Sequence, residues 1–128
     1  MQSYALELAT TSLRGSKPFN MGSLYWQLND VWPVSSWATV DYLQVKKAAH
    51  YRIKEIYEPL KVAAFNPEPQ NIDNYVIYAV NDYNKKFNCH FEMKLMSFAG
   101  QVLNTTYAEK IIQPLSNSQI VKMLTTPE

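Results

Sequence analysis

The sequence predicts an α+β chain in which a helix–strand–helix unit, residues 1–57, is followed by an immunoglobulin-like β-sandwich, residues 58–128. Apolar residues recur with a helical period on both sides of a short aromatic stretch. Beyond Leu60 they alternate with polar residues at a period of two, as in half-buried strands. A complete (β/α)8 barrel is excluded, because it needs about 250 residues.

The first predicted helix covers residues 2–14. Its apolar side chains recur at helical spacing and form one stripe, made of Ala5, Leu8, Ala9 and Leu13. Gly15 follows Arg14 at the position where a C-capping glycine usually ends a helix. We therefore expect this helix to end at Arg14.

A short strand is predicted over residues 22–28. The segment is too short for a helix, and apolar or aromatic residues occupy both of its alternating faces, as in a strand buried on both sides. Residues 29–33 end it, and residues 35–40 form a loop. The aromatic content is concentrated here, because all three tryptophans lie within residues 26–37.

The second predicted helix covers residues 42–57. Asp41 is placed to cap it, and Gln44 occupies the third position of a capping box. Its buried stripe is expected to contain Ala48, Ala49, the stem of Arg52, Ile53 and Ile56. Pro59 stops the helix and favours an extended conformation at Glu58, which puts the domain boundary there.

Five strands are predicted after the boundary: residues 60–65, 75–80, 87–95, 101–107 and 119–124. Turn signals at 66–69 and 81–84 separate the first three. The third alternates most clearly, which indicates one buried and one solvated face. Short strands with turns between them favour an immunoglobulin-like sandwich, which needs about 100 residues for seven strands. We therefore expect this sandwich to lack its last one or two strands.

The composition excludes several classes of function. The chain carries 12 Lys and Arg against 11 Asp and Glu, a net charge of +1, which argues against nucleic-acid binding. No apolar run is long enough to cross a membrane. The lone Cys89 has no disulfide partner within the chain and belongs to no metal-binding pair. We expect neither a metal nor a cofactor.

One stretch carries a specific resemblance. The string Trp-Gln-Leu-Asn-Asp-Val-Trp-Pro occupies residues 26–33, followed by Ser36-Trp37, Asp41-Tyr42 and His50-Tyr51. Over residues 2–57 the chain resembles the C-terminal part of β-mannosidases of glycoside hydrolase family 2. The resemblance implies that residues 2–14 and 42–57 are the last two helices of a (β/α)8 barrel and residues 22–29 its eighth strand. The following residues would begin the next, immunoglobulin-like domain.

The resemblance also implies where substrate binds. Active sites of such barrels lie at the carboxyl ends of the strands, so Trp26, Asn29 and Asp30 would lie near the sugar site. Trp26 would line the subsite for the non-reducing mannose, since an indole face offers an apolar platform to a sugar ring. The residues themselves leave alternatives open. In the alternative interpretation, Trp26 is a residue of the hydrophobic core. Asn29 and Asp30 then only accept hydrogen bonds from backbone donors at the end of the strand.

No catalytic residue is expected in this chain. Retaining glycosidases need two carboxylates about 5–5.5 Å apart, and the resemblance implies that both are Glu residues on strands preceding Gln2. The first 57 residues contain only Glu7, Asp30, Asp41 and Glu55, of which Asp30 alone ends the predicted strand. We therefore expect an enzyme, a retaining β-mannosidase acting on mannosides or manno-oligosaccharides, only in the longer parent. The compartment is unknown, and the resemblance implies a periplasmic, secreted or lysosomal parent.

Two other functions remain open at this stage. The chain is alternatively an immunoglobulin-like carbohydrate-binding module that uses an exposed tryptophan, or a sandwich that binds other proteins. In the fragment interpretation its partner is the missing barrel segment. Exposed strand edges tend to pair with other chains, so we also expect homo-oligomers to form through residues 24–28 or through the unfinished sandwich edge.

Overall fold

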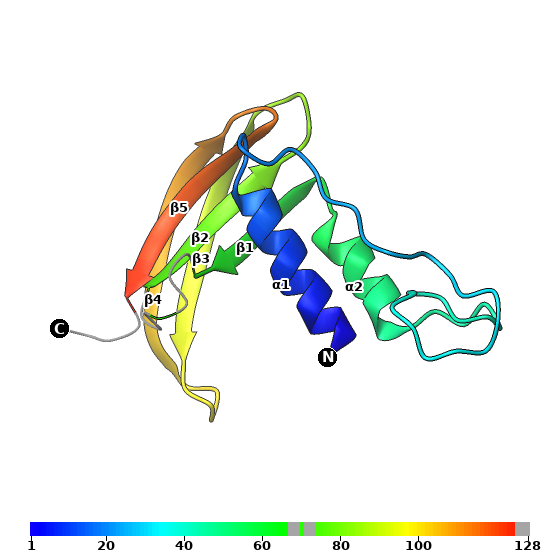
Figure 1. Ribbon diagram of the computed structural model, residues 1–128. Helices are drawn as coiled ribbons and strands as arrows, with labels where there is room; N and C mark the ends of the chain where they lie inside the picture. The colour runs from blue at the N-terminus through cyan, green and yellow to red at the C-terminus, as the bar shows by residue number, and fades with distance from the viewer. Residues whose placement is uncertain (67–69, 71–73, 125–128) are drawn as a thin grey trace.

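The computed structural model describes residues 1–66, 70 and 74–124. Its elements are α1 (Gln2–Gly15), α2 (Ala48–Ile56), β1 (Leu60–Phe65), β2 (Asn74–Asn81), β3 (Phe87–Met96), β4 (Val102–Ile112) and β5 (Ser116–Leu124). The helices pack side by side next to the strands, and a long loop between them extends past the first turn of α2 (Figure 1). The predicted α+β class is confirmed.

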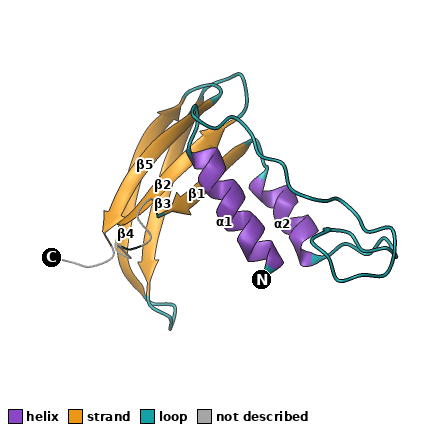
Figure 2. Cartoon of the chain, viewed as in Figure 1, coloured by secondary structure: helices purple, strands orange, loops and turns teal. Residues whose placement is uncertain are grey.

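The strands form two antiparallel sheets (Figure 2). The larger sheet has the order β1-β2-β5, and the smaller sheet pairs β3 with β4. This arrangement confirms the predicted immunoglobulin-like sandwich, and each of the five predicted strands is present. The turn predicted at 66–69 lies outside the described residues, except for Asn66.

The sandwich core lies between the two sheets. Ala79, Ile112 and Ile120 are buried at its centre, and Ile77, Cys89, Phe91 and Ala108 pack around them. Along β3 the side chains alternate between half-buried and exposed, with Cys89 and Phe91 inside and His90 and Glu92 outside. The predicted solvated face of this strand is therefore confirmed.

The predicted strand at residues 22–28 is wrong. The segment is extended, but no residue of it is assigned to a strand or bridge; a single parallel bridge, between Asn29 and Val40, follows directly after it. Nor is it buried on both faces, because Leu24, Trp26 and Leu28 are exposed while the intervening side chains are half-buried. A strand requires neighbouring backbone to pair with, and no described strand lies beside this segment.

The second helix begins later than predicted, at Ala48. Asp41 does not cap it; its carboxylate accepts a hydrogen bond from the Val45 amide (2.8 Å) and closes a turn. Gln44, predicted in the capping box, has a φ of 66°, which no helical residue adopts. Lys47 is the N-cap. The predicted stripe is buried at Ala49, Ile53 and Ile56, half-buried at Arg52 and exposed at Ala48.

The first helix is present as predicted, but Gly15 is not its cap. The helix continues through Gly15 to a cap at Ser16. Its buried residues are Thr10 and Arg14, whereas the apolar stripe Ala5, Leu8, Ala9 and Leu13 is exposed. The polar face packs on the sheet through specific bonds, for example from the Tyr78 hydroxyl to the Thr11 carbonyl. The apolar stripe of α1 therefore has no cover in the described part of the chain.

Candidate functional site

The three predicted site residues lie on the loop between α1 and α2, and the structure separates them by burial. Trp26 is 71% exposed and Asn29 is also exposed, whereas Asp30 is only 5% exposed. The Asn29 side chain donates to its neighbour, the Asp30 carbonyl (3.2 Å). Trp26 and Asn29 are thus available to a ligand, and the Asp30 carboxylate is turned inward.

Asp30 is the anchor of the loop. One carboxylate oxygen accepts a hydrogen bond from the Ser36 hydroxyl (2.5 Å), and the other accepts from the Lys47 ammonium (3.2 Å). The pKa of Asp30 is lowered, chiefly by the Ser36 hydrogen bond and then by Lys47, against the opposing effect of burial. The carboxylate therefore ties the middle of the loop to Ser36 and to Lys47, the N-cap of α2.

Hydrogen bonds to backbone carbonyls also hold this loop in place. Thr39 is fully buried, and its hydroxyl and amide both donate to the Leu28 carbonyl (3.0 and 3.1 Å). The Asp30 amide donates to the Val40 carbonyl (3.0 Å), and the Lys47 amide to the Thr39 carbonyl (2.9 Å). Trp26 thus lies two residues before Leu28, whose carbonyl is fixed by these hydrogen bonds.

The loop displays an unusually apolar surface. Trp32 and Trp37 are each 62% exposed, so all three tryptophans of the loop are exposed. Trp26 is joined to Gln27 by a cis peptide bond. Further exposed large side chains of this loop are Phe19, Met21, Leu24, Leu28, Val31, Val34, Tyr42, Leu43 and Val45. Exposed apolar patches of this kind mark contact sites for ligands or other polypeptide. We call residues 19–45 the aromatic loop.

All four carboxylates of residues 1–57 have protein partners. Glu7 pairs with Arg52, Glu55 with Arg52 and Lys61, and Asp41 with the Val45 amide. The pKa of Glu55 is lowered by its hydrogen bond from Lys61 and by the charges of Lys61 and Arg52. The pKa values of Asp30 and Glu55 are thus both lowered, whereas the pKa of a catalytic acid must be raised.

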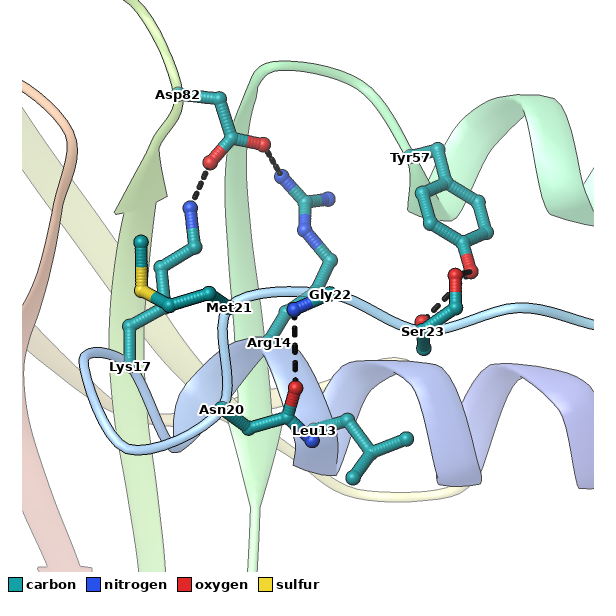
Figure 3. A pocket seen from close by; sticks show the side chains of 9 residues that line it. All are labelled: Leu13, Arg14, Lys17, Asn20, Met21, Gly22, Ser23, Tyr57 and Asp82. Carbon is teal, nitrogen blue, oxygen red and sulfur yellow. Dashed lines mark hydrogen bonds and ion pairs between the residues drawn. The ribbon is translucent and has the colours of Figure 1, made fainter.

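A small hollow of about 230 Å³ lies where α1 meets the loop and the turn after β2 (Figure 3). Asp82 accepts hydrogen bonds from both Arg14 (2.9 Å) and Lys17 at its upper rim, and Tyr57 bonds to the Ser23 hydroxyl (2.7 Å) at the far side. Arg14 also donates to the Ile56 and Glu58 carbonyls. The charged groups that line the hollow are therefore already bonded to one another or to backbone carbonyls. We conclude that they join α1 to the end of α2 and to the turn after β2.

The described part of the chain contains neither a metal-binding cluster nor a membrane-spanning helix. No cluster of three or more His, Cys, Asp or Glu residues is arranged to hold a metal ion. No described helix has both the length and the apolar character needed to span a membrane.

Sequence reasoning missed the partners of the site residues. Ser36 and Lys47 lie six and seventeen positions from Asp30, and no local pattern joins them. Arg14 and Asp82 are 68 positions apart. The one available signal was Lys47, a cation directly before a helix, where its charge is unfavourable unless a carboxylate offsets it.

The chain is similar in structure to segments of two longer glycoside-cleaving enzymes. The chain superposes on the β-D-mannosidase of Dictyoglomus thermophilum with a TM-score of 0.84 and 26% identity, covering 98% of this chain and 15% of that one. An exo-chitosanase of Amycolatopsis orientalis matches with a TM-score of 0.72 over 99% of this chain and 15% of its own, and its 19% identity shows the fold alone.

The particular relatives are β-mannosidases. The rat enzyme is 33% identical over 81 residues, which are 63% of this chain and 9% of that protein. β-Mannosidase A of Aspergillus terreus is 44% identical over 57 residues, 44% of this chain and 6% of that enzyme. No family model matches the chain. The predicted resemblance to β-mannosidases is confirmed, and the chain spans less than a tenth of the length of these two relatives.

Proposed function

We propose that this chain is a segment of a longer β-mannosidase-type glycoside hydrolase that removes terminal β-mannosides with retention of configuration. Residues 1–57 would supply its last barrel unit, and residues 58–128 would begin the following sandwich. The observation that carries the proposal is the exposed indole of Trp26 on a loop anchored beside Asn29. This is the kind of platform that a sugar ring needs.

The uncovered surfaces support the barrel interpretation. The apolar stripe of α1 is exposed, and so are Leu24, Trp26 and Leu28 along one face of the extended segment between the helices. Barrel strands pair with a neighbour on each side and barrel helices pack against one another. Neighbouring barrel units would cover these surfaces and supply the ladder that residues 22–29 lack here.

Within the proposed sugar site the three residues have different roles. Trp26 stacks on the sugar ring, and Asn29 hydrogen-bonds a hydroxyl. Asp30 holds the loop that carries both, since Ser36 and Lys47 occupy its two carboxylate oxygens. Asp30 is therefore a positioning residue in this proposal.

The isolated chain is proposed to be inactive. A retaining glycosidase needs a nucleophile and an acid/base about 5–5.5 Å apart. The carboxylates of residues 1–57 are engaged in ion pairs or turn bonds, and the two with shifted pKa values are both shifted downward. Hydrolysis would require the two Glu residues proposed to lie on earlier barrel strands.

Two measurements test this function. Purified chain is incubated with 4-nitrophenyl β-D-mannopyranoside, and no release above the buffer rate is expected. Hydrolysis that follows the protein through purification would contradict the inactive-segment proposal. The reading frame upstream of residue 2 is expected to encode a long chain; an upstream stop codon would contradict the fragment interpretation.

The second candidate is a non-catalytic carbohydrate-binding module, favoured by the three exposed tryptophans. Titration with manno-oligosaccharides, followed by tryptophan fluorescence, separates it from the first. Saturation at millimolar or lower concentration, lost in Trp26→Ala and kept in Trp32→Ala, would identify a module. A linear response in all three chains is the result expected for a segment whose site is completed elsewhere.

A further inference from the structure

A groove of about 730 Å³ runs between α1 and β1, two elements that lie side by side in Figure 1. Its volume is about three times that of the hollow beside Arg14 and falls within the range of about 300–1,000 Å³ that is typical of small-molecule sites. Among the described residues, none of the aromatic loop lines this groove. Its lining therefore shares no residue with the proposed sugar site around Trp26.

The helix and the strand each turn one face toward the groove. Tyr4, Leu8 and Thr11 follow one another at spacings of four and three positions and therefore share one face of α1. On the strand, Ala63 pairs with Tyr78, whose hydroxyl bonds to the Thr11 carbonyl. The face of β1 that carries Ala63 is thus the face turned toward α1. Of the apolar stripe of α1, only Leu8 lines the groove.

Three aromatic rings, each from a different element, line the groove: Tyr4 of α1, Phe65 of β1 and Tyr75 of β2. Tyr4 is 66% exposed and Tyr75 is 40% exposed, while Phe65 is half-buried. A tyrosine offers an apolar ring face together with a hydroxyl at its edge. Within the described part of the chain neither tyrosine hydroxyl has a hydrogen-bond partner, so both are open to a ligand.

The charges beside the groove balance one another. Glu7 lies 3.4 Å from Arg52, and Glu55 lies 2.7 Å from Arg52 and 3.2 Å from Lys61. Two carboxylates thus face two cations, and a charged ligand would meet no uncompensated opposite charge. Only one oxygen of Glu7 is engaged by a described residue, and its other oxygen can accept a hydrogen bond from a neutral hydroxyl.

We propose that this groove is a carbohydrate site that binds a neutral oligosaccharide. Sugar rings would stack on Tyr4 and Tyr75, and sugar hydroxyls would bond to the two tyrosine hydroxyls and to the Glu7 carboxylate. A neutral sugar matches the lining because it has apolar C–H faces with hydroxyls around their edges, and it carries no charge to be compensated. The proposal depends neither on catalysis nor on the site around Trp26.

The test is a titration of the full chain with β-mannotriose. Because no tryptophan lines the groove, binding is followed by the amide shifts in nitrogen–proton correlation spectra. Amides of α1 and β1 are expected to shift saturably at millimolar concentration. Trigalacturonate, which is anionic, and adenosine, which stacks but is not an oligosaccharide, are the comparison ligands, and both are expected to bind at least about tenfold more weakly.

Variants locate the binding. Tyr4→Ala is expected to weaken it about five- to tenfold, because a stacking face is lost, and Tyr4→Phe is expected to weaken it less. The matched control is Tyr51→Ala, at a tyrosine that is 62% exposed on α2 and does not line the groove. This control and Trp26→Ala are both expected to bind like the parent chain. Circular dichroism checks that every variant is folded.

Four results would overturn the proposal. The first is the absence of saturable shifts with β-mannotriose. The second is unchanged binding in both Tyr4→Ala and Tyr75→Ala, and the third is equal binding of trigalacturonate or adenosine, which would show an unselective apolar groove. The fourth is loss of binding in Trp26→Ala, which would assign the sugar to the aromatic loop. Hydrolysis of a mannoside by the chain would contradict the inactive-segment proposal alone, so the two failures are distinguishable.

Discussion

Gly15 and Tyr78 lie so close that a side chain at position 15 has no room. A Cβ atom built on Gly15 would stand 2.7 Å from Cζ and 2.9 Å from Cε1 of the Tyr78 ring. The ring is only 3% exposed, and its hydroxyl donates to the Thr11 carbonyl, so it cannot move aside. Asn117 donates to the Gly15 carbonyl from β5. This contact joins α1 to the larger sheet.

The first prediction concerns this contact. Gly15→Ala is expected to lower the free energy of unfolding by about 1–2 kcal/mol. Overpacking costs about 1–3 kcal/mol, while alanine regains up to about 1 kcal/mol of helix propensity. Urea unfolding measures the difference. Gly22→Ala is the control, because a Cβ there meets nothing within 4 Å. Equal stabilities of the two variants would contradict the predicted clash.

The second prediction concerns alkaline pH. Burial raises the pKa of Tyr78 from 10.0 to about 12, with the nearby Arg14 charge acting in the opposite direction. The unfolded state therefore loses this proton first as pH rises. Tyr78 should contribute its full stabilisation below pH 10.0 and lose about 1–2 kcal/mol as pH rises through the folded pKa of about 12.

Urea unfolding at pH 8 and pH 11 tests this contribution. Tyr78→Phe is expected to be less stable at pH 8 by about 0.5–1.5 kcal/mol, because it loses the hydrogen bond to Thr11. The gap between Tyr78→Phe and the parent chain should narrow at pH 11. The two chains differ only at position 78, so a gap that stays constant or widens would refute the assignment.

The third prediction concerns Arg14, which joins α1 to the end of α2 and to the turn after β2. Arg14→Ala is expected to lower the free energy of unfolding by about 2–4 kcal/mol, because removing the buried guanidinium leaves the Ile56 and Glu58 carbonyls without their donor and Asp82 without one of its cations. Arg14→Lys should recover little of this, since one ammonium cannot reach Ile56, Glu58 and Asp82 as the forked guanidinium does. Thermal unfolding of both variants measures the effect; full recovery by lysine would show that charge alone matters.

The fourth prediction concerns Asp30. Asp30→Ala is expected to loosen residues 30–47 without unfolding the sandwich, because both of its partners lie in that segment. Limited proteolysis should cut the aromatic loop several-fold faster, while circular dichroism retains the strand signal. Asp41→Ala, which loses one turn bond, is the milder control. Equal cleavage of Asp30→Ala and the parent chain would contradict the anchoring role.

The same anchor has a pH dependence of defined sign. Because the pKa of Asp30 is lowered in the folded chain, its contribution is present above the ordinary value of 3.8. The contribution is lost as pH falls through the lower folded value. Loop cleavage by pepsin should therefore accelerate for the parent chain between pH 4 and pH 2, relative to Asp30→Ala. Identical pH dependence of loop cleavage in the two chains would show that the Asp30 carboxylate does not stabilise the loop.

Local pattern by itself determined α1 and all five strands, and the motif at residues 26–33 determined the resemblance to β-mannosidases. Periodicity succeeds there because α1 closes its hydrogen bonds within itself and each of the five strands has a neighbouring strand to pair with. Residues 22–28 have the composition of a buried strand, but they remain extended and half-exposed because no described neighbour pairs with them.

Only the tertiary structure decided which side chains are buried and what they bond. In the folded chain the Asp30 carboxylate points inward and bonds to Ser36 and Lys47. Trp26 and the apolar stripe of α1 remain exposed. Position 15 requires glycine because the Tyr78 ring, 63 positions away in the chain, lies against it. These outcomes depend on contacts between residues distant in the chain, and no local period encodes such contacts. The start of α2 was decided by a shorter-range contact, the backbone bridge between Val40 and Lys46.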